Sequence, residues 1–288
     1  MRRKALRQTG FDMRLTSLAT SIWASAGLML AGSSAVAQEV TQELEIVGAP
    51  ELGGTGFQYA ATELMRDIVW LDNMLLVIIT IISLFVTGLM AWIVLRYNSK
   101  RNKTPATFTH NSPLEVAWTV IPIVILVFIG AFSLPVLFKQ QEIPVGDINI
   151  KVTGYQWYWG YEYVDDGVAF DSYMLAEDEL SDFGYTDDLY LLATDTAVVV
   201  PVGATVVMTV TGADVIHSWT IPAFGVKQDA VPGRLAQLWF AAEREGVYFG
   251  QCSELCGKDH AYMPITVKVV SQDTYDTWLA EAKIENGV

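Results

Sequence analysis

Length, composition and charge set the first limits on what this chain can be. It has 288 residues, of which 52% are hydrophobic, and its formal net charge is −14. So high a hydrophobic content is unusual for a soluble protein and predicts membrane segments. The acidic charge argues against nucleic acid as a partner, because it repels the phosphate backbone.

The first 37 residues are predicted to be a cleaved secretory signal. Five basic side chains precede residue 15 against the single Asp12, residues 15–30 are largely apolar, and positions 35–37 read AVA. Signal peptidase accepts this small-x-small form. A third membrane span is the alternative, but the apolar run is interrupted by polar residues and is shorter than the ~20 residues a span needs. Residues 38–72 would then be an extracytoplasmic segment.

Two later segments are predicted to cross a membrane. Residues 73–95 and 116–138 are predominantly apolar and contain no charged side chain, and each is long enough to span the hydrocarbon core. A buried core helix is rarely apolar on every face over such a length. The loop 96–115 between them holds four basic side chains and no acid before Glu115. The positive-inside rule places this loop in the cytoplasm and residues 139–288 outside it.

The segment from about residue 143 to 270 has the pattern of an all-β domain. Short runs rich in β-branched and aromatic residues alternate with Gly, Asp and Pro clusters, which is typical of an antiparallel sandwich or a small barrel. The predicted strands are IKVTGYQWYW, YLLATD, AVVVPVG, TVVMTVTG, QLWFAAE, GVYFGQC and ITVKVV. Residues 271–283 are expected to form an amphipathic helix, with Ser271 as N-cap and one face made by Tyr275, Trp278, Leu279 and Ala282.

Acidic side chains gather in one part of this domain. Between Lys151 and Lys227 the sequence has no Lys or Arg, but it contains twelve Asp and Glu residues. Such a field attracts a cationic partner and speeds its encounter at low salt. A solvated face that keeps the domain soluble explains the charge equally well.

The stretch GQCSELCGKDHAYMP contains the chain's only two cysteines, followed closely by His260 and Met263. In an oxidising compartment Cys252 and Cys256 could form a disulfide, and zinc also accepts two cysteines and two histidines. The spacing of Cys256, His260 and Met263 matches the single loop of cupredoxin copper ligands. His217, which is expected to end a strand-like run, would supply the histidine from a separate loop. Because a blue copper site needs one cysteine, two cysteines favour two coppers bridged by two thiolates.

With these motifs on one chain, the sequence resembles subunit II of bacterial and mitochondrial cytochrome c oxidase, and in particular the CuA-containing subunit of aa3-type haem-copper oxidases. The resemblance is carried by CSELCGKDHAYM, IHSW, GYQWYWGYEY and DAVPGR. It implies a membrane-anchored all-β protein, in which a two-helix transmembrane hairpin precedes a cupredoxin-like β-sandwich or barrel and a short C-terminal helix. The cupredoxin domain would cover residues 139–288.

The resemblance also implies roles for the residues of the motif. The two cysteines would be the bridging thiolates of the binuclear copper centre CuA, and His217 and His260 its terminal ligands. Met263 would be a weak ligand of one copper, and the backbone carbonyl of Glu254 a weak ligand of the other. The Glu254 carboxylate would in addition bind a magnesium or manganese ion shared with subunit I.

The aromatic run GYQWYWGYEY is expected to lie on one strand, with Tyr155, Trp157 and Trp159 on the same face. Packing is the ordinary interpretation of such aromatic residues. The resemblance implies instead that Trp157 takes electrons from cytochrome c. The acids that would dock the lysine ring of cytochrome c are Glu162, Asp171, Asp195 and Asp214.

Glu115, just ahead of the second span, would correspond to the carboxylate at the cytoplasmic mouth of the proton pathway called the K channel. An acid at a helix start near the membrane surface is an equally good interpretation of this position.

These inferences predict an electron-transfer subunit of cytochrome c oxidase in the bacterial cytoplasmic membrane, with its C-terminal domain in the periplasm. The chain would accept electrons from cytochrome c and pass them to haem in subunit I, where oxygen is reduced to water with proton pumping. The CuA domain of a nitrous oxide reductase is an alternative, disfavoured because that enzyme is soluble and has a second, larger catalytic domain. An alternative of another class is a membrane-tethered copper-delivery or structural module with a Cys252–Cys256 disulfide.

Overall fold

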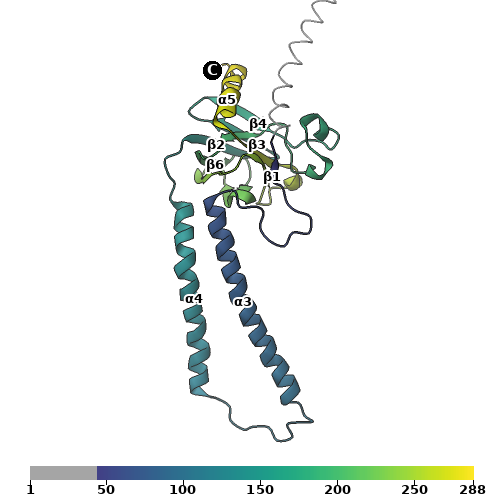
Figure 1. The fold of residues 1–288 in the computed structure, drawn as a ribbon, viewed down its shortest axis with the longest axis vertical. Coiled ribbons are helices and arrows are strands. Elements are labelled where there is room, and N and C mark those ends of the chain that lie inside the picture. Colours follow the sequence, from purple (N-terminus) through teal and green to yellow (C-terminus); the bar gives the residue numbers. More distant parts are fainter. Residues whose placement is uncertain (1–43) are drawn as a thin grey trace, which may run out of the picture.

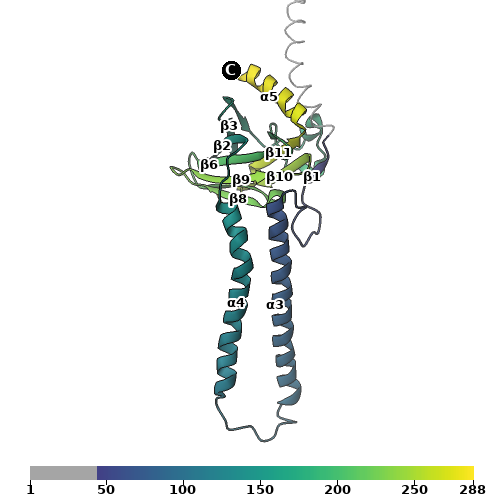
Figure 2. The same cartoon turned by 60° about the vertical axis from the view of Figure 1, so that its left-hand side comes forward.

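The structure, a computed structural model, describes residues 44–288. Two long helices run side by side below a β domain, and a short C-terminal helix lies on the opposite side of that domain (Figure 1). The turned view shows the loop between the two long helices at the end remote from the β domain (Figure 2). The expected signal, residues 1–37, lies outside the described residues.

The two long helices are α3, Glu63–Arg96, and α4, Ser112–Gln141. Each begins at a side chain that caps a free backbone N–H, Thr62 for α3 and Asn111 for α4. Within the described chain, an 18-residue window of each helix is strongly apolar, and none of that window is buried. A surface of this kind suits lipid rather than water. Both expected spans fall inside these helices.

Polar contacts join α4 to the β domain and to α3. On the α4 side, Trp239 of the β domain donates its indole N–H to the carbonyl of Lys139 at 3.2 Å. The Lys139 ammonium lies 2.7 Å from a carboxylate oxygen of Glu63 and 2.7 Å from one of Asp67, both on α3. One cation therefore ties the two helices together where they meet the β domain.

The strands form two larger sheets and one small one. In spatial order the sheets are β1-β10-β11-β5, β4-β3-β2-β6-β9 and β7-β8. The strand bounds are β1 Ile46–Gly48, β2 Ile148–Tyr155, β3 Tyr158–Tyr163, β4 Val168–Ser172, β5 Val198–Pro201, β6 Thr205–Gly212, β7 His217–Ile221, β8 Val226–Ala230, β9 Ala236–Ala241, β10 Gly246–Gln251 and β11 Pro264–Val270.

The sandwich is confirmed, but its sheets are mixed rather than antiparallel as expected. β1 runs parallel to β10, β2 to β6, and β5 to β11. After β2 the chain forms β3, β4 and β5 before it returns as β6 and pairs with β2. A strand that returns through such a long connection can run in the same direction as its neighbour, which a tight hairpin does not allow.

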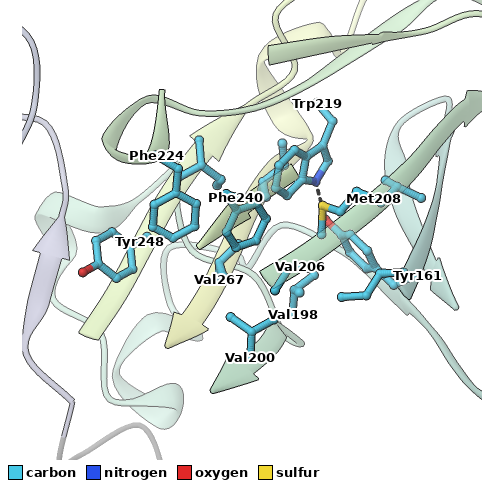
Figure 3. Close-up of a cluster of buried hydrophobic side chains, with 14 of the residues drawn as sticks. Tyr161, Val198, Val200, Val206, Met208, Trp219, Phe224, Phe240, Tyr248 and Val267 are labelled. Atoms are coloured by element: carbon cyan, nitrogen blue, oxygen red, sulfur yellow. Dashed lines mark hydrogen bonds between the residues drawn. The ribbon is translucent and has the colours of Figure 1, made fainter. Parts of the chain in front are cut away.

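Large aromatic side chains fill the space between the sheets (Figure 3). Phe224 stacks on Phe240 with ring centroids 4.7 Å apart, and Trp219 lies nearly parallel to Phe240 at 6.3 Å. The indole N–H of Trp219 donates to the hydroxyl of Tyr161 at 3.3 Å. Because Trp219 is on β7, this core holds the strand that begins at His217.

The aromatic run is a hairpin, so the prediction of a single strand is wrong. β2 ends at Tyr155 and β3 starts at Tyr158, and these two residues are paired across the antiparallel ladder. Trp157 therefore lies in the turn. The reversal breaks the expected alternation, since Trp159 is fully buried while Tyr155 and Tyr158 stack on each other at 4.7 Å on the outer side.

Two further local predictions are corrected. Residues 190–195, expected as a strand, form a turn after the short 3-10 helix Asp187–Leu189, and Leu191 has a φ of 71° that a strand does not allow. Tyr190, Leu192 and Ala193 pack in a small second core with Leu180 and Phe249. His217 begins β7 rather than ending a strand.

The closing helix is confirmed as α5, Gln272–Asn286. Ser271 caps it by accepting a hydrogen bond from the backbone N–H of Thr274 at 3.3 Å. The expected apolar face, with Tyr275 and Trp278 at its centre, packs on the core.

Candidate metal centre

The cysteine stretch is the loop that joins β10 to β11. These strands pair antiparallel, so the ends of the loop are close, and the backbone N–H of Cys252 donates to the carbonyl of Met263 at 3.4 Å. The start of β7 lies against the same loop, because the N–H of Ser253 donates to the carbonyl of Ser218 at 3.0 Å. His217, which precedes Cys252 by 35 residues in the sequence, therefore lies next to the loop.

The side chains of this loop converge on one small buried volume. The Sγ atoms of Cys252 and Cys256 are 3.8 Å apart, and with a ring nitrogen of His217 they form a group of potential metal ligands within 4.8 Å of one another. His260 Nδ1 and Met263 Sδ each lie 3.5 Å from Cys256 Sγ. Thiolate, imidazole and thioether in such proximity are the ligands that copper prefers.

The loop backbone contributes a further oxygen. The carbonyl of Glu254 lies 3.4 Å from Cys252 Sγ, while the Glu254 side chain is exposed. The carbonyl therefore faces the sulfur cluster, and the carboxylate is free to face a partner.

The two cysteines are thiols in this structure. Their Sγ separation of 3.8 Å is well beyond the about 2.05 Å of a disulfide bond. Both cysteines and Met263 are buried. The geometry thus supports metal ligation over the disulfide alternative.

The ionisation of the Cys252 and Cys256 thiols is also consistent with a metal ion. Burial opposes ionisation of Cys252, but hydrogen bonds from His217 and from the backbone lower the pKa of its thiol to about 7. Burial and the neighbouring Cys252 raise the pKa of Cys256 to about 12. Two adjacent thiolates repel each other, and bound cations remove that cost. The residues present therefore fit a copper centre with two bridging thiolates.

His217 is oriented by a carboxylate on its far side. The ring is fully buried, and Nε2 lies 2.9 Å from Asp214 Oδ1 while Nδ1 lies 3.9 Å from Cys252 Sγ. Burial disfavours the charged imidazole, but Cys252 and Asp214 raise the pKa of His217. Metal-bound histidines commonly donate their second N–H to a carboxylate in this way, which fixes the tautomer.

Comparisons with known proteins point to one family. The family model described as cytochrome c oxidase subunit II, periplasmic domain, matches residues 148–270, and that described as its transmembrane domain matches residues 50–136. Cytochrome c oxidase subunit 2 of Cereibacter sphaeroides is 61% identical over 285 residues, which cover 94% of this chain and 93% of that protein. Probable cytochrome c oxidase subunit 2 of Rickettsia felis is 46% identical over 225 residues, covering 78% and 70%.

Among solved structures, the periplasmic domain of subunit II (CoxB) of Bradyrhizobium japonicum is 49% identical, covers 50% of this chain and 98% of that one, and superposes with a TM-score of 0.45. The chain belongs to the cytochrome c oxidase subunit II family. The expected resemblance, the fold and the role of bringing electrons into a haem-copper oxidase are confirmed. As a subunit II, the chain is anchored in a membrane and carries a periplasmic domain.

In this subunit II, Trp157 contacts residues 252–263, which are called the copper-ligand loop from here on. A Cβ built on Gly257 would lie 2.9 Å from Cζ2 of the Trp157 ring, so the loop backbone and the ring are in direct contact. Gln156, which the sequence did not single out, donates from Nε2 to the carbonyl of Cys256 at 2.9 Å, and its backbone N–H donates to Asp214 at 2.8 Å. The only indication of Gln156 in the sequence was its position beside Trp157.

The four expected docking acids have different surroundings. Glu162 and Asp171 line a shallow hollow of about 340 Å³ on the outer side of β2, β3 and β4, where Glu162 pairs with Lys151 at 3.1 Å. Asp195 is partly buried and accepts backbone hydrogen bonds from Tyr173 and Thr196.

Asp214, the fourth of these acids, is hydrogen-bonded to Gln156, Val215 and His217. Glu162 and Asp171 are thus surface groups, whereas Asp195 and Asp214 also hold the local backbone.

Glu115 lies in the first turn of α4, in the region expected to be cytoplasmic and remote from the copper-ligand loop (Figure 1). Its Oε1 accepts a hydrogen bond from the backbone N–H of Asn111 at 3.3 Å. This contact, together with the Asn111 cap, resembles a capping box.

Proposed function

We propose that this subunit II receives electrons from cytochrome c at Trp157, holds them at a binuclear copper centre, and passes them to haem in subunit I. Cys252 and Cys256 would hold the two coppers through their thiolates, with His217 and His260 as further ligands. Met263 and the Glu254 carbonyl would complete the set as weak ligands. When bound, the coppers supply a one-electron redox couple shared between two metals.

The convergence of sulfur, imidazole and thioether atoms on one buried loop is the observation that carries this proposal. Burial keeps water away from the thiolates, and the strands at both ends of the loop hold its backbone. A ligand set that moves little on oxidation or reduction keeps the reorganisation cost of electron transfer small. In the described part of this loop, the expected ligands all bind metal, so none of them needs to act as an acid or a base.

The surroundings of the loop support a cationic electron donor. Asp214 lies beside the ligand His217, and Glu162 and Asp171 lie on the nearby outer face. We propose that these acids, with Asp195, attract the lysine ring of cytochrome c and orient it toward Trp157.

Three finer assignments belong to the same proposal. The exposed Glu254 carboxylate is free to bind a magnesium or manganese ion together with subunit I. Glu115 is proposed at the mouth of a proton pathway at the cytoplasmic end of α4. The membrane is proposed to be the bacterial cytoplasmic membrane, with residues 73–95 and 116–138 spanning it and 139–288 in the periplasm.

The copper assignment is tested in the purified oxidase. Cys252→Ser and Cys256→Ser should each remove two copper atoms per complex and abolish a mixed-valence paramagnetic signal spread over two copper nuclei. His260→Asn should perturb this signal while the haem spectra stay unchanged. A wild-type complex without that signal, whose two cysteines are joined as a disulfide, would support the structural-module alternative instead.

A further inference from the structure

A lysine stands over Trp157 in the copper-ligand loop. Lys258 lies between the ligands Cys256 and His260, and its ammonium is 5.3 Å from the centroid of the Trp157 ring. The same ammonium lies 3.2 Å from a carboxylate oxygen of Asp259, and the side chain is 77% exposed. A cation at this distance from an indole face is a favourable cation–π contact.

The backbone, and not only the side-chain rotamer, keeps this charge near the ring. Gly257 has a φ of 130° and lies so close to Trp157 that a Cβ there would be 2.9 Å from the ring. The Gln156 amide bonds to the Cys256 carbonyl and holds the loop against the turn that carries Trp157. Lys258 follows Gly257 directly in the chain, so its ammonium lies near Trp157. A donor that approaches Trp157 therefore also approaches this ammonium.

The sign of this charge is opposite to that of its surroundings. Glu162 and Asp171 on the outer face and Asp214 beside the loop give the region a negative field. Lys151, the basic side chain of that outer face, is already paired with Glu162 at 3.1 Å. The proposed docking face is therefore acidic around its margin, whereas the exposed Lys258 ammonium, paired with Asp259, lies next to Trp157.

We propose that Lys258 is a specificity determinant for the electron donor. It favours a c-type cytochrome whose basic side chains lie at the margin of the contact and whose surface opposite Trp157 carries no lysine. A donor with a lysine at that central point is repelled by the Lys258 ammonium, or must displace it toward Asp259. This inference rests on the proposed role of Trp157 as the point where electrons enter.

The test uses the complete oxidase with three variants of Lys258 and Lys283. Lys258→Gln removes the charge, Lys258→Arg retains it, and Lys283→Gln on α5 is the matched control, because it changes the net charge equally outside the loop. The measured quantities are the second-order rate constant and the equilibrium affinity for a soluble cytochrome c whose lysines lie at the margin of the contact, and for a variant of that donor with one lysine introduced opposite Trp157, each at low and high ionic strength. An unchanged copper spectrum verifies that the loop is intact.

For the donor with the central lysine, Lys258→Gln should raise both quantities about three- to tenfold at low ionic strength, as expected for one pair of like charges in contact with water, and the gain should vanish at high salt. For the donor with lysines only at the margin, the gain should be smaller. Lys258→Arg should behave as the wild type. Equal gains in Lys258→Gln and Lys283→Gln would overturn the inference, since net charge alone would then explain them, and so would no change in Lys258→Gln.

Trp157→Phe in the same assay separates the two proposals. If Trp157→Phe slows electron transfer while Lys258→Gln has no effect, only the role of Lys258 fails. If Trp157→Phe retains the wild-type rate, the proposed route through Trp157 fails, and the inference about Lys258 fails with it.

Discussion

Single residues at this site serve two purposes at once, and Asp214 is the clearest case. Its carboxylate accepts hydrogen bonds from the backbone of Gln156 and from His217, and its side chain still reaches solvent. Glu162, by contrast, pairs only with Lys151 at the surface. Both acids therefore contribute to the field seen by a donor, but only Asp214 also supports the ligand geometry.

Replacing these two acids should separate docking from ligand support. Glu162→Gln should slow reduction by cytochrome c only at low ionic strength, because it removes a surface charge. Asp214→Asn should do the same and, in addition, shift the copper spectrum and lower copper affinity about 10- to 100-fold, because the hydrogen bond to His217 is weakened. Stopped-flow kinetics, copper titration and paramagnetic spectra measure these effects. Identical copper spectra in the two variants would argue against a supporting role for Asp214.

Trp157 provides the second residue-scale prediction. Trp157→Phe should lower the rate of electron transfer from bound cytochrome c while leaving its affinity nearly unchanged, because the proposed contribution of the indole is electronic contact rather than binding. Rapid-reaction kinetics at saturating donor give the rate, and equilibrium titration gives the affinity. A parallel loss of rate and affinity would indicate that the ring acts mainly by packing.

At the scale of elements, the close contact of β10 with β7 brings the ligands together. Gly250 on β10 faces the carbonyl of Thr220 on β7 so closely that a Cβ would collide with that oxygen. The absence of a side chain at this position lets the loop that starts at Cys252 reach His217. A glycine is needed here for space and not for an unusual φ.

Gly250→Ala should therefore separate β10 from β7. Because the obstacle is backbone, we expect destabilisation by about 3 kcal/mol, the upper end of the usual cost of overpacking, and loss of copper binding. Thermal unfolding and copper content of the purified oxidase measure the effect. Gly56→Ala, where no atom lies within 4 Å of the new Cβ, is the control and should change stability by less than about 0.5 kcal/mol. Copper binding that survives in Gly250→Ala would contradict this account of the contact.

At the scale of the whole molecule, the β domain and the loop between α3 and α4 lie at opposite ends of a long helical hairpin (Figures 1 and 2). The Lys139 ion pairs with Glu63 and Asp67 join the two helices at the end nearer the β domain. If both helices cross the membrane as proposed, the copper-ligand loop lies on one side of it and the basic loop on the other.

This arrangement predicts the sidedness of chemical labelling. A cysteine introduced at Lys103 should react with a membrane-impermeant maleimide only when the cytoplasmic face is accessible, as in inverted vesicles. One introduced at Leu52, which is fully exposed in the segment before α3, should react only in right-side-out spheroplasts. Mass spectrometry of the labelled chain gives the result, and labelling of both positions from the same side would rule out the proposed topology.

The parts of this protein that depend on local chemistry were predictable from its sequence. Apolar runs long enough to span a bilayer, the cap at Ser271, and the spacing of Cys256, His260 and Met263 can all be read from neighbouring residues, because hydrophobic length, capping and loop ligation act over short separations.

How distant segments pack against one another became evident from the structure alone. Alternation in a sequence reports burial but not the partner of a strand, so the parallel pairing of β2 with β6 and the reversal at Trp157 were not predicted. His217 was expected to join the cysteine loop, but the contact between β7 and that loop that brings it there, and the position of Lys258 over Trp157, depend on packing between residues far apart in the chain.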